Sequence, residues 1–156
     1  MDSTEHLGKL HILNRETWLP VSVDEAFEFF CSPYNLERIT PPEMSFRVVE
    51  SPTVPLREGA IIDYRLRLWG LPFRWQSKIS DWRPGEGFVD QAHISPYRHW
   101  RHIHELRPEN AGTRMTDQVE YVLPLQPLGE LAHFLVRRQL ERIFDFRQKT
   151  IQKIFT

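Results

Sequence analysis

The sequence has very little cysteine: Cys31 is its only one in 156 residues. A single cysteine excludes an internal disulfide and a cysteine-based zinc cluster, and it favours a reducing compartment. The sequence also lacks an excess of charge of one sign, because 20 Lys and Arg residues face 21 Asp and Glu residues, for a formal net charge of −1. This balance argues against bulk electrostatic binding to nucleic acid or to an anionic membrane surface.

Long hydrophobic runs are absent as well, since none approaches the ~20 residues that a membrane span needs. The first six residues are polar and acidic, which is not the pattern of a secretory signal. We therefore expect a cytoplasmic protein without a membrane span. The sequence has no internal repeat, low-complexity tract or Gly/Ser linker. We expect one domain over residues 1–156, with its core at about 7–155, that is a monomer or a homodimer.

The sequence has twelve prolines, and we expect them to lie between helices and strands. A first strand is predicted over residues 7–19. Ser22 followed by Glu25 three residues later is a capping-box signature, and it predicts a short helix over 23–31. A second short helix over 34–39 should end at the Thr-Pro-Pro sequence that follows.

The middle of the chain alternates apolar and polar residues with a period of two. This pattern predicts strands over residues 46–50, 62–68, 73–82, 88–93, 97–106 and 113–122. Apolar residues at steps of three and four then predict one long helix over 128–155. This order of elements predicts an α+β fold, in which a curved antiparallel sheet of about seven strands wraps around the C-terminal helix. A curved sheet and one helix cannot touch everywhere, so a cavity between them is expected.

The strand over 97–106 places unusual side chains on its more apolar face. Trp100, His102 and His104 fall on that face, where an ordinary core would have Val, Ile or Leu. A buried polar group without a partner costs roughly 1–3 kcal/mol. Either a network inside the fold or a ligand must therefore satisfy these imidazoles.

Asp117 lies on an otherwise apolar face of the last predicted strand. If the last two strands are neighbours, Asp117 can contact His102 or His104. Such a pair can prepare a histidine for general-base catalysis, and it can equally stabilise a buried histidine, so the three residues are both catalytic candidates and a structural network. His102 and His104 could also share a metal with Asp90, Asp117 or Glu120. Because this candidate set includes no cysteine and the sequence has no helical His-Glu-x-x-His motif, we expect neither a metal nor another cofactor.

Arg147 falls on the apolar stripe of the long helix, between Ile143 and Ile151. Three interpretations are open. The arginine can extend along its stem to solvent, pair inside the fold with Asp117 or Asp90, or bind the carboxylate of a ligand.

Aromatic residues are frequent in the predicted sheet, and the chain has 5 tryptophans. They can simply fill the core, or they can line a pocket for a flat or apolar ligand. The ligand-binding candidates are Tyr64, Leu66, Trp75, Phe88, Asp90, Trp100, Tyr121 and Arg147. The apolar connections 69–72 and 123–128 can line the pocket entrance, seal the core or contact a second chain.

Four segments, 30–42, 88–91, 100–104 and 112–121, resemble those of a known superfamily. This is the START/Bet v 1-like superfamily, also called SRPBCC or polyketide cyclase/dehydrase-like, and within it the ligand-binding subgroup of small bacterial proteins. The resemblance covers roughly residues 10–155. It implies a helix-grip fold with a hydrophobic pocket, but it sets no reaction, because the superfamily includes carriers, receptors, cyclases and oxygenase subunits. The Rieske ligands and iron triad of the oxygenases have no counterpart motif in this sequence.

The expected function is binding of a small hydrophobic or aromatic molecule in the cavity between the sheet and the long helix. One alternative is a cyclase, dehydratase or hydrolase-like enzyme that uses His and Asp in the same cavity. A second alternative is a non-catalytic protein-contact or regulatory domain with a closed cavity. A cavity below the ~300 Å³ lower range of ligand sites would favour this last alternative.

Overall fold

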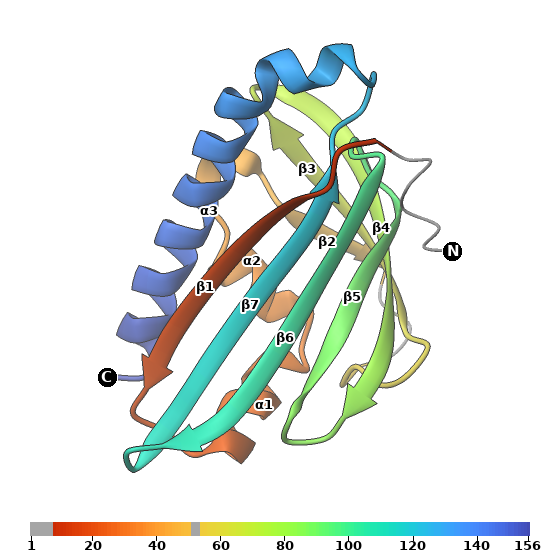
Figure 1. Ribbon diagram of the computed structural model, residues 1–156. Coiled ribbons are helices and arrows are strands. Elements are labelled where there is room, and N and C mark those ends of the chain that lie inside the picture. The colour runs from red at the N-terminus through yellow and green to blue at the C-terminus, as the bar shows by residue number, and fades with distance from the viewer. Residues whose placement is uncertain (1–7, 51–53) are drawn as a thin grey trace.

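A seven-stranded antiparallel sheet curves around one long helix in the computed structural model, which describes residues 8–50 and 54–156 (Figure 1). The strand order is β1-β7-β6-β5-β4-β3-β2. The strands are β1 (His11–Leu19), β2 (Arg47–Glu50), β3 (Ile61–Leu68), β4 (Leu71–Arg83), β5 (Gly87–Ile94), β6 (His99–Glu109) and β7 (Gly112–Val122). The helices are α1 (Val23–Phe30), α2 (Tyr34–Arg38) and α3 (His133–Ile154), with 3-10 turns η1 (Pro42–Met44) and η2 (Leu128–Ala132). The predicted α+β class and order of elements are confirmed.

The short helix α1 begins where the capping signature predicts. The Ser22 hydroxyl oxygen accepts a hydrogen bond from the backbone N–H of Glu25 at 3.2 Å, which satisfies a donor that the first helical turn leaves free. The predicted strand over 7–19 is shorter than expected, because β1 begins at His11. Leu7 lies outside the described residues.

Among the described residues, three prolines do not lie between elements, so this part of the prediction is wrong: Pro42 begins η1, and the other two lie inside strands. Pro72 is inside β4 and Pro108 is inside β6. Both prolines lie in parts of their strands that extend beyond β5. The pairing of β4 with β5 ends at Gln76 of β4, before Pro72 is reached, and the pairing of β6 with β5 ends at Glu105 of β6, before Pro108. A proline has no N–H to donate, and it is tolerated where the sheet offers no acceptor on that side.

The predicted helix over 128–155 is divided into η2 and α3. Gly129 passes so close to the preceding loop that an added Cβ would lie 2.0 Å from the carbonyl oxygen of Pro124. This tight approach turns the chain before α3 starts at His133. Within the described ranges, none of the helices is both long enough and apolar enough to cross a bilayer.

The core lies between the concave face of the sheet and α3. The helix buries Leu140, Phe144 and Ile151, which belong to the predicted apolar stripe. At the other end of the core, Phe29 of α1 packs edge-on against Phe155, with ring centroids 5.3 Å apart. The short helices therefore close the end of the sheet where α3 finishes (Figure 1).

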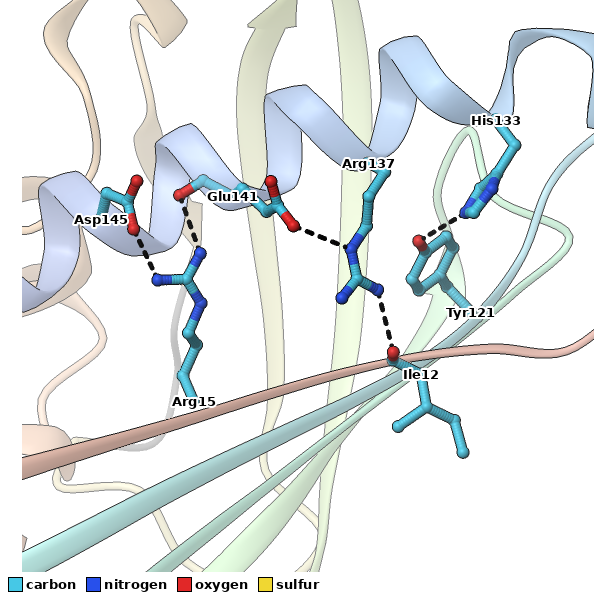
Figure 2. A network of polar contacts seen from close by, with 7 residues as sticks. All are labelled: Ile12, Arg15, Tyr121, His133, Arg137, Glu141 and Asp145. Atoms are coloured by element: carbon cyan, nitrogen blue, oxygen red, sulfur yellow. Dashed lines mark hydrogen bonds and ion pairs between the residues drawn. The ribbon is translucent and has the colours of Figure 1, made fainter.

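Polar contacts attach α3 to the edge strand β1, as Figure 2 shows. Arg137 donates to the backbone carbonyl of Ile12 at 2.9 Å and to the Glu141 carboxylate at 3.2 Å. Two turns further along the helix, Asp145 pairs with Arg15. These contacts occupy part of the free edge of the sheet. They also fix the direction in which α3 crosses the strands, and so the position of its inward side chains.

Candidate functional site

A cavity with a volume of about 110 Å³ lies between α3 and the sheet. Nine of the candidate residues from the sequence line it: Tyr64, Leu66, Trp75, Phe88, Asp90, Trp100, His102, His104 and Arg147. The lining also includes residues that sequence reasoning missed, among them Phe30, Leu36, Met44, Tyr97, Ile143 and Phe144. Their only signal was apolar periodicity, which a lining residue shares with any core residue.

The neighbouring strands β5 and β6 supply part of the polar lining, and β7 supports it from behind, because residues alternate between the two faces of the sheet. On β6, His102 and His104 are buried while Arg101 and Glu105 point to the other face. Asp90 of β5 is directly opposite His102 in the strand pairing. On the far side of β6, Asp117 of β7 is directly opposite His104.

Asp117 forms the predicted contact with both histidines. Its Oδ1 atom lies 2.8 Å from Nε2 of His102 and 3.2 Å from Nδ1 of His104. The two imidazole rings lie against each other, with centroids 3.7 Å apart. Asp117 is 5% exposed and does not line the cavity within the described part of the chain. The carboxylate therefore lies behind the histidines, which separate it from the cavity.

Burial and pairing lower the pKa values of both His102 and Asp117. Desolvation, with the nearby His104, lowers the pKa of His102 to about 3 in spite of its hydrogen bond to Asp117. Burial alone would raise the pKa of Asp117, but the contacts from His102 and His104 outweigh it and hold that pKa well below its usual range. At neutral pH, His102 is therefore a neutral imidazole that donates from Nε2 to an ionised Asp117.

Arg147 lines the cavity and its Nε atom is buried, which favours the inward interpretations over extension along its stem to solvent. Its guanidinium carbon is 4.9 Å from the centroid of the Phe144 ring. Among residues 8–50 and 54–156, no carboxylate lies within ion-pair distance of it. The internal ion pair with Asp117 or Asp90 is therefore not formed. Burial lowers the pKa of Arg147, and the negative charges of Asp117 and Asp90 oppose this shift.

Three polar atoms that belong to cavity-lining residues have no hydrogen-bond partner in the described part of the chain. They are the Tyr64 hydroxyl, Oδ1 of Asp90 and Nε of Arg147. Burial raises the pKa of the Tyr64 hydroxyl, so it stays protonated. Burial also raises the pKa of the Asp90 carboxyl, although the Ser77 hydroxyl and the Arg147 charge act against it. The cavity thus offers donors and an acceptor that the fold itself does not use.

Tyr121, one of the predicted ligand-binding residues, lies outside this cavity. Within the described ranges Tyr121 is not part of the lining. It is fully buried, and its hydroxyl shares a hydrogen bond with Nε2 of His133 at 3.0 Å (Figure 2). The connections 69–72 and 123–128 contribute nothing to the described lining either. Leu123 is buried in the core, whereas Leu125 and Trp69 are exposed.

A second cluster, at the junction of β1, η2 and α3, was missed by sequence reasoning. His11 Nε2 lies 2.7 Å from Oε2 of Glu130, and the His11 ring stacks on that of His133 with centroids 3.6 Å apart. Burial would raise the pKa of Glu130, but hydrogen bonds from Gln126 and His11 hold it below its usual value. Desolvation lowers the pKa of His133. The available signal in the sequence was the spacing of three between Glu130 and His133.

The sequence of this chain matches a known protein-family model. The family model described as "Domain of unknown function (DUF8410)" matches residues 35–155, which is most of the chain. The chain belongs to this DUF8410 family. No curated protein sequence matches it.

Solved structures share the architecture of this DUF8410 member over almost its whole length. The Zhui aromatase/cyclase of Streptomyces sp. R1128 has a TM-score of 0.74 at 11% identity, covering 93% of this chain and 93% of its own. Ginseng major latex-like protein 151 from Panax ginseng has a TM-score of 0.66 at 12% identity, covering 95% and 99%. The protein TTHA0849 from Thermus thermophilus has a TM-score of 0.69 at 16% identity, covering 92% and 95%. At these identities the likeness shows the fold alone, and it confirms the helix-grip fold of Bet v 1-like and polyketide cyclase-like proteins.

Proposed function

We propose that this chain binds a small molecule with an apolar body of about one ring and an oxygen-bearing polar group. The observation that carries this proposal is the set of three unpartnered polar atoms, on Tyr64, Asp90 and Arg147, in a cavity whose other lining residues are mostly apolar. Each buried polar atom without a partner costs roughly 1–3 kcal/mol. A ligand that bonds to these atoms recovers that cost, which gives the site both affinity and orientation.

The size of the cavity limits the ligand. Its volume of about 110 Å³ is below the ~300 Å³ lower range of sites for drug-sized ligands. It is comparable to an engineered cavity of about 150 Å³ that binds benzene in another protein. A single aromatic ring with one polar substituent therefore matches the space. The rings of Trp75 and Trp100, which meet edge-to-face at 5.1 Å, supply flat apolar walls.

The polar end of the ligand would lie toward Arg147. A guanidinium donates but cannot accept, so its partner has to be an oxygen acceptor such as a carboxylate, a carbonyl or a hydroxyl. Tyr64 can donate to the same group. Asp90, whose pKa is raised, can donate when protonated or accept from a hydroxyl when ionised.

Binding is a better account of the site than acid-base catalysis. Binding accounts for the unpartnered atoms, and His102 in particular is a poor general base near neutral pH, because desolvation lowers its pKa to about 3. The alternative of a closed cavity in a protein-contact domain agrees with the small volume. It leaves the unpartnered atoms of Tyr64, Asp90 and Arg147 unexplained.

The test is a titration of three matched probes, toluene, benzyl alcohol and benzoate, followed through the tryptophan indole N–H signals in ¹H–¹⁵N NMR spectra. The signals of Trp75 and Trp100 should shift on binding, because both residues line the cavity. The signal of Trp18 should not shift, because its indole N–H is bonded to the carbonyl of Glu109, away from the cavity lining. The two oxygen-bearing probes should bind more tightly than toluene.

The variant Arg147→Met keeps an apolar stem and removes the guanidinium. We expect it to weaken benzoate binding by about tenfold or more, the value of a hydrogen bond to a charged group, and to leave toluene binding nearly unchanged. Arg142→Met is the matched control, because Arg142 lies on the exposed face of the same helix. The proposal is wrong if none of the three probes shifts the two cavity tryptophans, or if Arg147→Met and Arg142→Met bind benzoate equally well.

A further inference from the structure

A second cluster of titratable side chains lies outside the cavity, where three elements meet. His11 is the first residue of β1, Glu130 belongs to η2, and His133 is the first residue of α3. One ligand-type atom from each of them lies within 4.8 Å of the other two. Figure 2 shows His133 at this end of α3, above the sheet and beside Tyr121. Residues that are far apart in the sequence thus form one compact donor set.

We propose that His11, Glu130 and His133 bind a zinc ion, with a fourth coordination position left for water. Two imidazoles and one carboxylate are a ligand set that zinc takes in sites with an open position. Ligand atoms around a tetrahedral zinc are about 3.3 Å apart, since each lies ~2.0–2.1 Å from the metal. Atoms that are now within 4.8 Å of each other therefore need to move by at most about 1.5 Å.

The spacing of Glu130 and His133 suits joint coordination. Residues three apart lie on the same face of a helical turn, so both side chains can point to one ion. The His11 ring is nearly parallel to that of His133, at an interplanar angle of 16°. One of the two rings has to turn for both nitrogens to face the metal. His133 is the less buried of the two residues, so its ring is the one we expect to turn.

Neighbouring groups hold these ligands in the way that outer-shell partners hold metal ligands. The Gln126 amide donates to Oε1 of Glu130 at 2.8 Å, which leaves Oε2 directed toward His11. The buried Tyr121 hydroxyl is 3.0 Å from Nε2 of His133 and can donate to a bound water instead. The nearby cation Arg137 already pairs with Glu141 at 3.2 Å, so its charge is largely balanced.

The buried cluster of His102, His104 and Asp117 offers the same atom types, but it is a poorer metal site. Both of its imidazoles converge on one carboxylate oxygen, and all three residues are less than 10% exposed. As at the junction, an ion there would have to replace a hydrogen bond between a histidine and a carboxylate, but it would have to do so inside the buried core. The junction cluster, by contrast, is open to solvent on the side of Glu130, whose side chain is 23% exposed.

The experiment is zinc titration of the chain without a polyhistidine tag by isothermal calorimetry, with cobalt as a coloured substitute for zinc. We expect a single zinc equivalent and the visible absorption of tetrahedral cobalt. Glu130→Gln and His133→Asn should each weaken zinc binding by about 100-fold, as expected for the loss of a ligand or of its support. His93→Ala, which removes an exposed histidine elsewhere, should bind like the unmodified chain.

A long-range ¹H–¹⁵N imidazole spectrum identifies the site without any variant. Zinc should change the ring signals of His11 and His133 and leave those of His102 and His104 in place. Absence of measurable heat, unchanged binding in both ligand variants, or zinc-dependent changes at His102 and His104 would each overturn the proposal. Because no cavity residue takes part, failure of this site would leave the proposed ligand binding unaffected.

Discussion

Two inward-facing acids on either side of β6 have opposite surroundings. Asp117 contacts two imidazoles through one oxygen, and its pKa is held low. Asp90, on the other side of the same strand, has one oxygen without a partner, and its pKa is raised. The difference teaches that burial alone does not define a functional carboxyl group. Satisfied polar atoms stabilise a fold, whereas unsatisfied ones leave interactions for a ligand.

The largest expected change in the free energy of unfolding comes from lowering the pH, which tests the His102 side of the Asp117 network. Its pKa falls from the ordinary 6.5 to about 3 on folding. Between these values the unfolded chain holds a proton that the folded chain does not, so the free energy of unfolding decreases as the pH falls. We expect a loss of about 2–4 kcal/mol over this range. Asp117 adds to it in the same direction below its ordinary pKa of 3.8.

Urea unfolding at a series of pH values measures this loss. The comparison is with His102→Gln, which keeps a polar side chain but cannot titrate. This variant should be less stable near neutral pH, and its stability should change less steeply as the pH is lowered from 6.5 to about 3. Equal slopes for the two proteins would show that His102 is not held neutral.

The next largest effect should come from Asp117→Asn. It removes the charge that accepts from His102 at 2.8 Å and keeps the volume of the side chain. We expect the free energy of unfolding to fall by roughly 1–3 kcal/mol, because a charge-assisted hydrogen bond is replaced by a weaker one in a dry site. Chemical denaturation at neutral pH checks this value. Unchanged stability would mean that the network is not formed in solution.

The smallest effect, and the one of opposite sign, is expected for Asp90→Asn. Ionised Asp90 is desolvated without a full set of partners, so replacing it with a neutral amide should raise the free energy of unfolding by up to about 1 kcal/mol. Because the folded pKa is raised, this gain should be larger at higher pH and should disappear as the pH falls and Asp90 becomes protonated. A loss of stability as large as that of Asp117→Asn would remove the contrast between the two acids.

Local sequence patterns were enough to predict most of the helices and strands of this protein and the faces of the strands. A period of two assigned His102 and His104 to the inner face of β6, and three-to-four-residue steps assigned Phe144 and Arg147 to the inner stripe of α3, because these patterns depend only on local geometry. The capping signature at Ser22 is local in the same way.

Which of these inward groups meet depends on tertiary packing and could not be predicted from local patterns. Whether Arg147 pairs with Asp90 or faces a cavity depends on how far α3 stands from the sheet, and no local pattern encodes that distance. The contact of Asp117 with His102 required the register of β7 against β6. The junction of His11 with His133 required that the edge strand return beside the start of α3, which is a consequence of strand order, since residues distant in sequence become neighbours only when the sheet closes around the helix.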